Sequence, residues 1–466
     1  MHYILRFINW CMIDTNLPDG PSMPTLLRQM KLVFQPLEYL EDFAKIYGDN
    51  FTIKNKNGNH TVYFSHPQAL EQIFTADASK LDAGSENQIL KYLFGSNSVV
   101  ILDGTPHRNQ RKLLAPPFHG DRMRAYGAII QSITQKVINS WQDTKPFNVH
   151  NAMQEITIRI ILRVVFGLDE GASTEKLRQS LISLLELVGY PVVSGALLFK
   201  FWKKDLGIWS PWGRIIYLIK QVDELIYSHI QETRKNFNPN RQDILSLMMT
   251  ARYDNGQPMT DEELRDELVT LLVIGHETVT SSLVWALSWV DKLPEVQEKL
   301  QSELQQNKLE ASELAKLPYL TAVCQETLRI CPVGTTCFSR IVKSSLNIMG
   351  YELPPKTLII PNIYLAHHRE EVYPNPKQFI PERFLQRQFS PYEYLPFGGG
   401  NRQCIGMAFA MYEMKIILGT ILTQYKISSL NRRLPNSHIR PVRRGLTIVV
   451  PPKTQMQATR LLSPKF

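Results

Sequence analysis

The sequence predicts a mainly α-helical fold with a small β-sheet subdomain. Between residues 120 and 330, apolar side chains recur at spacings of three and four, the period of helices packed on a core. Short strand-like runs occur towards both ends of the chain. With 466 residues, 44% of them apolar and 20% charged, the chain can bury a large core and enclose a pocket.

The chain divides into a short N-terminal extension, residues 1–16, and a single domain, residues 17–466. A stiff Leu-Pro-Asp-Gly-Pro turn at 17–21 separates them. The extension is apolar-rich, but Arg6 and Asn9 interrupt it, so we expect neither a signal peptide nor a membrane span there.

The strand-like runs predict the small sheet. Residues 51–53 and 61–64 flank an Asn57-Gly58 turn, which is typical of a β-hairpin. Further strands are expected near 346–349, 358–361 and 446–450.

Charge and cysteine usage narrow the function classes. The net charge is +9, and residues 421–466 hold nine Lys or Arg and no acidic residue. Few aromatic residues accompany them, which argues against a nucleic-acid-binding protein. The basic residues then form either a solvated surface or a docking surface for an acidic protein. Five cysteines without a C-x-x-C pair favour a reducing compartment, and we expect a cytoplasmic protein.

One helix is unusually long. Thr260 and Glu263 form a capping box, and no proline follows until Pro294, so the helix spans about thirty residues. Its middle, residues 271–274, is apolar and is expected to cross the core.

Four residues that suit a buried helix poorly follow that stretch: Gly275, His276, Glu277 and Thr278. Glycine costs about 1 kcal/mol in a helix interior, and the Thr278 hydroxyl is expected to bond the Ile274 carbonyl and bend the helix. The pattern indicates a functional distortion; the alternative is a solvent-facing patch on an amphipathic helix.

A glycine-rich loop precedes another apolar helix, which starts at Met407. It places Cys404 near the helix N-terminus, where the macrodipole and free amides stabilise a thiolate able to ligate iron or attack an electrophile. No Lys-Ser/Thr follows, so a phosphate-binding P-loop is excluded. The alternative is an inert buried cysteine in a turn.

Four motifs in order resemble those of the cytochrome P450 haem-thiolate monooxygenases. The loop fits F-x-x-G-x-x-x-C-x-G through Phe397, Gly400, Cys404 and Gly406, with Arg402 in its usual place. The other three are an E-x-x-R helix (Glu326–Arg329), a P-E-R-F loop (residues 381–384) and the helix stretch 275–278. The resemblance implies a triangular fold with haem b between the long central helix and the Cys-loop helix.

The resemblance assigns roles near the iron. Cys404 is the axial thiolate ligand, whose electron donation favours O–O cleavage. Thr278 and Glu277 form a proton-delivery pair, unless the turn is merely a structural kink. Ile274 departs from the family, which usually has a small residue there, and Val279 replaces a common threonine; Ile274 is expected to narrow the pocket.

The resemblance also names residues that hold the haem or support its loop. His107, Arg111, Arg340 and Arg402 match the partners of the propionates, which need cations. A buried ion network that fixes the Cys loop is expected from Glu326, Arg329 and Arg383.

The resemblance to the P450 family also predicts which residues contact the substrate. Val333, within residues 332–337, and residues 82–105 should line a largely apolar pocket together with Ile274. Residues 190–217 are rich in aromatics and lysines and match the family's lid over the substrate channel; contact with a membrane surface is the alternative.

The function expected is hydroxylation or epoxidation of an apolar substrate, a long-chain fatty acid or terpenoid, with O₂ as co-substrate. No reductase domain is fused, so electrons should come from a separate ferredoxin or flavodoxin, whose acidic surface suits the basic charge. We expect a monomer. A haem-thiolate isomerase or peroxygenase, and a haem-binding sensor without turnover, stay open as alternatives.

Overall fold

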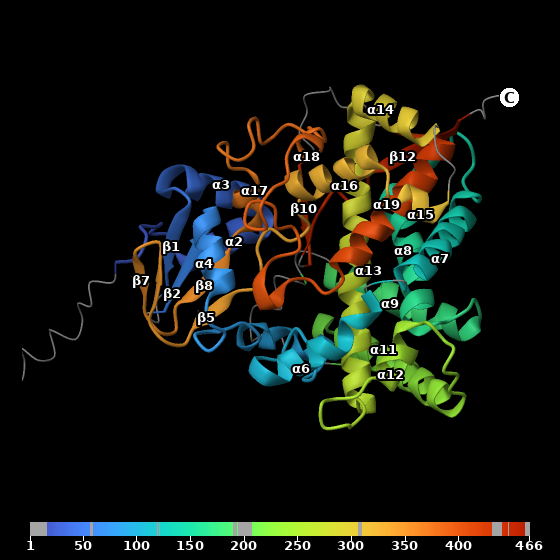
Figure 1. Ribbon diagram of the computed structural model, residues 1–466, viewed down its shortest axis with the longest axis horizontal. Helices are drawn as coiled ribbons and strands as arrows, with labels where there is room; N and C mark the ends of the chain where they lie inside the picture. The colour runs from blue at the N-terminus through green and yellow to red at the C-terminus, as the bar shows by residue number, and fades with distance from the viewer. Residues whose placement is uncertain are drawn as a thin grey trace, which may run out of the picture.

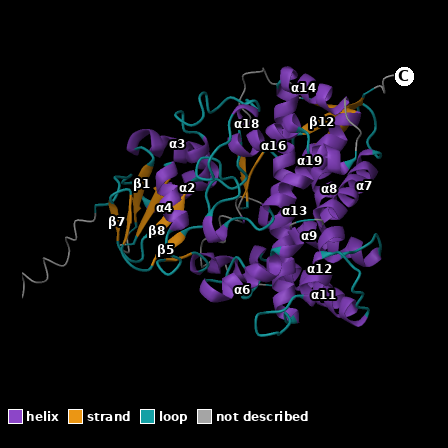
Figure 2. Cartoon of the chain, in the orientation of Figure 1, coloured by secondary structure: helices purple, strands orange, loops and turns teal. Residues whose placement is uncertain are grey.

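A computed structural model gives the fold, and it describes residues 16–461 except 56–58, 119, 121, 190–192, 194–206, 306–309, 431–439 and 446. A long central helix, α13, stands upright through the molecule, with a helical body on one side and a sheet-containing lobe on the other (Figure 1). Most strands gather in that lobe (Figure 2).

The helical body surrounds α13 and buries the main core between its members. The helices are α7 (Arg122–Ile138), α8 (Val149–Phe166), α9 (Ala172–Gly189), α11 (Pro211–Lys235), α12 (Ile244–Thr250), α13 (Asp261–Lys292), α14 (Pro294–Gln305), α15 (Ala311–Leu314), α16 (Pro318–Ile330) and α19 (Met407–Gln424).

The sheet lobe is built on a five-stranded sheet of order β1-β2-β8-β5-β3. Its strands are β1 (Asn50–Lys54), β2 (His60–Phe64), β8 (Leu358–Pro361), β5 (Arg340–Val342) and β3 (Leu81–Asp82). The helices of this lobe are α2 (Thr25–Phe34), α3 (Pro36–Tyr47), α4 (Pro67–Thr75) and α17 (Ile363–His367). The lobe has hydrophobic clusters of its own, separate from the core around α13.

Smaller sheets and short helices complete the chain. The strands are β6 (Leu346–Ile348) with β7 (Tyr351–Leu353), β4 (Pro146–Asn148) with β12 (Gln455–Arg460) and β9 (Tyr425–Ser429), and β10 (Val442–Arg444) with β11 (Thr447–Val449). The short helices are η1 (Ser85–Leu90), α5 (Lys91–Phe94), α6 (Gly104–Leu114), η2 (Pro116–Phe118), α18 (Arg383–Gln386) and η4 (Gly400–Arg402).

The predicted elements are found where the sequence places them. β1 and β2 pair antiparallel, as the hairpin pattern predicts, although their turn lies outside the described residues. The exception is β4, inside a stretch expected to be wholly helical. Three residues are too few for a periodicity to register, and the partner of β4 is β12, some three hundred residues later.

The long helix begins and ends as predicted. Thr260 and Glu263 make the reciprocal capping box, and α13 continues to Lys292 as an uninterrupted α-helix. The expected bend therefore does not break the helix. The turns on either side of residues 271–278 are fully buried, whereas most side chains within 271–278 are only partly buried.

By length and composition α13 is the one described helix able to cross a membrane, but 67% of its most apolar window is buried inside the protein. Burial of that kind is what the core helix of a globular fold requires.

Candidate functional site: a cysteine loop beneath the central helix

The Cys404 loop is shaped by its own backbone. The Cys404 N–H donates to the Phe397 carbonyl at 2.9 Å, which closes the loop just before α19. Gly398 and Gly400 adopt φ values of +70° and +66°, which favour glycine. A Cβ on Gly399 would lie 2.6 Å from the Phe74 ring, so the loop also needs the absence of a side chain there.

The Cys404 side chain is exposed, unlike the other described cysteines. Even so, the mass of protein around it raises the pKa of the thiol; the Gly406 N–H and the Arg111 charge act against this rise without overcoming it. The macrodipole argument predicted a stabilised thiolate, and burial proves to be the larger effect. Coordination to a metal ion would supply the missing stabilisation, because a metal deprotonates a bound thiol.

Three arginines and one histidine converge beside this loop. Burial first, and then the charges of Arg402, Arg111 and Arg340, lower the pKa of His107 to about 4, so these cations all act on one imidazole. Burial also lowers the pKa of Arg340 to about 10.

Arg402 serves mainly to hold the loop before α6. Its guanidinium donates to the Val99 carbonyl at 3.0 Å and also bonds the Leu102 carbonyl and the Asp103 carboxylate. Its Nε is buried and has no hydrogen-bond partner among the described residues. Arg402 therefore has one buried donor left for an anionic group.

These residues fit a haem by the chemistry of their donors. A soft sulfur ligand lies on one loop, and Arg111 acts electrostatically on it. The carboxylates that act on the Arg402 guanidinium are Asp103 and Asp82, whereas three arginines, Arg111, Arg340 and Arg402, act together on His107. An excess of buried basic groups needs anions, and the two propionates of a haem would provide them.

On α13, Thr278 and Glu277 point to different partners. The Thr278 hydroxyl donates to the Ile274 carbonyl at 2.8 Å, which confirms the predicted bond. The Glu277 carboxylate instead lies 3.1 Å from Arg444 Nε, on β10. Burial raises the pKa of Glu277 to about 7, and the Arg444 charge opposes that rise. The described structure shows no hydrogen bond between Thr278 and Glu277.

Gly275 has a packing role that the sequence did not reveal. A Cβ at this position would lie 2.9 Å from Ile161 Cδ1, on α8. The glycine therefore allows α8 to pack closely against α13.

The two predicted pocket residues differ in their surroundings. Ile274 is partly buried and packs at the margin of the main core. Val333 is buried, and its carbonyl accepts a hydrogen bond from the Ile448 N–H at 3.0 Å, which joins the 332–337 segment to β11.

Arg329 and Glu326, at the centre of the ion network, are completely buried. Arg329 donates to Glu326 through Nε at 2.6 Å and through Nη2 at 2.8 Å. Arg383 Nε lies 3.5 Å from Glu326 Oε1, so the structure brings all three predicted members together.

His367 links this network to the Cys404 loop, and sequence analysis did not single it out. Its Nδ1 lies 3.1 Å from the Arg329 carbonyl, and its Nε2 accepts from the Leu395 N–H at 2.9 Å. Burial holds the pKa of His367 well below its usual range, so the ring is neutral and has one donor and one acceptor nitrogen. Leu395 lies two residues before Phe397, where the loop starts.

A second set of contacts missed by the sequence clamps residues 97–99 to α13. The Val99 N–H donates to Glu267 at 2.7 Å, the Asn97 N–H donates to Asp266 at 2.9 Å, and the Ser98 and Thr270 hydroxyls lie 2.7 Å apart. A carboxylate pair in the buried half of a helix is the sequence signal for such a clamp, because buried charges need partners.

Much of the predicted lid, namely residues 190–192 and 194–206, lies outside the described residues. In the described part, Trp212 packs edge-on against Tyr92 at 5.4 Å, whereas Trp209 is 92% exposed.

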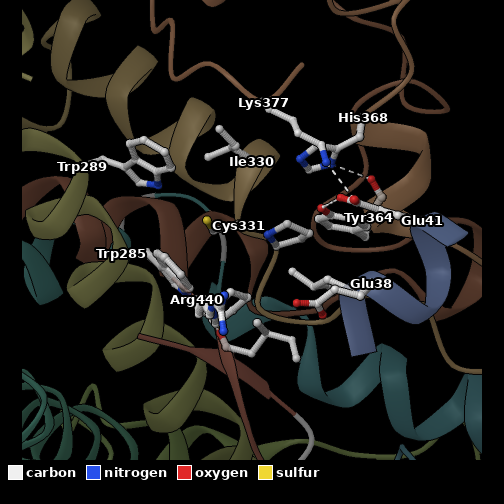
Figure 3. A pocket seen from close by; sticks show the side chains of 14 residues that line it. Glu38, Glu41, Trp285, Trp289, Ile330, Cys331, Tyr364, His368, Lys377 and Arg440 are labelled. Atoms are coloured by element: carbon white, nitrogen blue, oxygen red, sulfur yellow. Dashed lines mark hydrogen bonds and ion pairs between the residues drawn. The ribbon is translucent and has the colours of Figure 1, made fainter. Parts of the chain in front are cut away.

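A separate cavity of about 270 Å³ lies between α3, α13, α17 and the chain before β10 (Figure 3). Trp285, Trp289 and Cys331 line one side, and Glu41 with its partner Lys377 lies across from them. None of the predicted haem partners lines this cavity, so it is distinct from the Cys404 site.

Comparisons with known proteins agree with this geometry. A family model described as Cytochrome P450 matches residues 18–457. Cytochrome P450 135B1 of Mycobacterium bovis is 34% identical over 414 residues, covering 89% of this chain and 86% of the relative. Cytochrome P450 138 of Mycobacterium tuberculosis is 33% identical, covering 91% and 93%.

The fold has a solved counterpart as well. The structure titled retinoic acid bound cyanobacterial CYP120A1 superposes with a TM-score of 0.83 at 23% identity, and the match covers 96% of this chain and all of the other. This chain therefore belongs to the cytochrome P450 family of haem-thiolate monooxygenases, which use haem and O₂.

Proposed function

We propose that this P450 hydroxylates or epoxidises a long-chain fatty acid or a terpenoid, with Cys404 as the iron ligand and electrons from a separate ferredoxin or flavodoxin. The observation that carries the proposal is the convergence of Arg111 and the buried His107 beside the exposed Cys404 thiol. A haem held there would supply the oxidising chemistry at its iron.

The chain's own residues divide the remaining work. In this proposal His107, Arg111, Arg340 and the free Nε of Arg402 bind the propionates, and Cys404 holds the iron; the convergence of the four side chains supports it. Thr278 keeps a hydroxyl on the half-buried turn of α13, and Glu277 beside it titrates near neutrality, where it can both hold and release a proton.

The substrate class follows from the character of the surrounding segments. Leu93, Val99, Leu271 and Ile274 are partly buried apolar side chains at the margin of the core. The polar groups of residues 97–99 are occupied by α13, so the loop offers few free donors to a substrate. The retinoic acid bound by the structural neighbour is a terpenoid acid of the proposed type.

Two measurements test this function in order. A thiolate-type band in the ferrous–CO difference spectrum is expected from the holoenzyme, and its absence would overturn the assignment of Cys404. Product formation from fatty acids or terpenoids should then require reduced pyridine nucleotide, ferredoxin and its reductase. If hydrogen peroxide alone supports the same turnover, or no oxygen enters the product, the peroxygenase or the isomerase replaces the monooxygenase.

A further inference from the structure

The Glu277 carboxylate is paired with a cation from a different part of the chain. Arg444 Nε lies 3.1 Å from Glu277 Oε1, and both side chains are only 13% exposed. The two atoms do not meet hydrogen-bond geometry, and neither Glu277 oxygen has a hydrogen bond among the described residues. The interaction is therefore an ion pair, and the Arg444 charge favours the ionised form of Glu277.

Among the residues that the structure describes, Arg444 is the charged group that acts on Glu277. His276 on α13 and His150 on α8 are buried, and their ring nitrogens have no hydrogen-bond partner among the described residues. Burial first, and then Arg444, lower the pKa of His150 to about 4; burial and His150 lower that of His276 to about 3. Both imidazoles are therefore neutral at ordinary pH, and Glu277 is the group that titrates there.

The end of α9 makes room for the Arg444 side chain. A Cβ on Gly189 would lie 3.1 Å from both Cγ and Nε of Arg444. At that distance one of the two groups would have to shift. The absence of a side chain at position 189 thus leaves room for the Arg444 side chain.

The β10–β11 hairpin that carries Arg444 is anchored on several sides. Arg443 donates to the Leu32 carbonyl at 3.3 Å, and Trp285 Nε1 donates to the Ile448 carbonyl at 3.1 Å. The Ile448 N–H bonds the carbonyl of Val333, a predicted pocket residue. The hairpin thus connects the predicted substrate pocket with the partner of Glu277.

We propose that Arg444 is a positioning residue for proton delivery: it holds the Glu277 carboxylate toward β10, away from Thr278, and sets how readily that carboxylate releases its proton. The inference rests on the proposed monooxygenase function. In the step itself the Glu277 O–H bond breaks and its proton passes to a water molecule, which gives up a proton in turn to the Thr278 hydroxyl as that hydroxyl releases its own. The carboxylate left behind is stabilised by Arg444 until solvent returns a proton.

An infrared titration of the resting holoenzyme tests this without turnover. Subtracting the spectrum of Glu277→Gln isolates the carboxyl stretch of Glu277, and its midpoint is followed against pH. A cation favours the charged carboxylate, so Arg444→Gln should raise the midpoint by about one to three pH units. Arg444→Lys should keep it close to the wild-type value, because lysine retains the positive charge.

Arg443→Gln is the matched control, since it removes the same charge from the neighbouring position of β10 and should leave the midpoint in place. If Arg444→Gln does not fold, Gly189→Ala replaces it, because the added Cβ displaces the guanidinium and should raise the midpoint in the same direction. An unchanged midpoint in the Arg444 variant, or an equal rise in the Arg443 control, overturns the proposal.

Turnover separates this inference from the proposed function. With a fatty acid or terpenoid substrate, the pH profile of product formed per electron should move to higher pH in Arg444→Gln, together with the infrared midpoint. If the midpoint moves but no variant forms oxygenated product, the proposed function is wrong; the control of the Glu277 carboxyl by Arg444 then stands, but not its role in proton delivery. If product forms normally and the midpoint does not move, Arg444 has no such role.

Discussion

The Cys404 loop and the middle of α13 carry the two halves of the site, yet they are determined in different ways. The loop is shaped by its own residues: glycines at positive φ and one bond from Cys404 to the Phe397 carbonyl. The α13 stretch keeps regular helical backbone, and its properties come from distant partners, namely Ile161 on α8 and Arg444 on β10. A local motif therefore defines the Cys404 side of the site, and tertiary contacts define the α13 side.

The largest effect is expected from a substitution in the Cys404 loop, the locally determined half of the site. Cys404→Ser should abolish the thiolate-type CO band entirely, because an alcohol cannot donate as an anionic sulfur does. Cys337→Ser is the matched control, since its sulfur lies near Gly398 of the same loop and Cys337 is less exposed than Cys404. A band that survives in Cys404→Ser and disappears in the control would mean that the ligand is Cys337.

The next largest effect is expected from the ion network that supports the Cys404 loop. Arg329→Ala leaves Glu326 as a buried charge whose other cation, Arg383, lies 3.5 Å away, and should cost about 3–5 kcal/mol of unfolding free energy, measured in urea. Lys299→Ala breaks the exposed pair with Glu382 and should cost less than about 1 kcal/mol. Similar losses in both variants would show that the network does not stabilise the loop.

Sequence reasoning succeeded where the information is local. The capping box at Thr260, the length of α13 and the Thr278–Ile274 bond depend on residues three or four positions apart, and all were predicted. The partners of Glu277 and Gly275 were missed because each lies over a hundred positions away and presents no periodic pattern. His367 was missed for a different reason: its partners are only 38 and 28 positions away, but a lone histidine gives no sign that it joins Arg329 to the Cys loop.

Substitutions in the α13 half of the site should mainly affect coupling, that is, the product formed per electron consumed. Thr278→Ala should still bind haem and substrate but lower the product formed per electron by about ten-fold or more, because a hydroxyl that relays protons is lost. Hydrogen peroxide release measured against pyridine nucleotide consumption reports the change. Ser282→Ala removes the equivalent hydroxyl one turn later, bonded to the Thr278 carbonyl, and should leave coupling intact. Equal coupling in both variants would remove Thr278 from the relay.

Ile274→Ala should have a smaller effect, on both stability and pocket shape. The side chain is only partly buried, so the loss should be near the low end for such truncations, about 2 kcal/mol. Spectral titration with a graded series of fatty acids should show the bulkier members binding more tightly to the variant than to wild type. Identical ranking by the two proteins would mean that Ile274 packs sideways and does not narrow the pocket.

Gly275→Ala is the smallest change, and it separates local from distant causes within one turn of α13. Local propensity alone predicts a gain, because alanine is favoured over glycine inside a helix by about 1 kcal/mol. The contact with α8 predicts a loss, because the new Cβ would lie 2.9 Å from Ile161 Cδ1, and overpacking costs about 1–3 kcal/mol. We therefore expect a net loss of about 1 kcal/mol that the double variant with Ile161→Val recovers, since valine lacks the Cδ1 atom. Urea unfolding of the two single variants and the double variant measures this coupling. If Gly275→Ala is more stable than wild type, or if the effects of the two single changes simply add, the stability of α13 at this turn depends on its own sequence, as the shape of the Cys404 loop does.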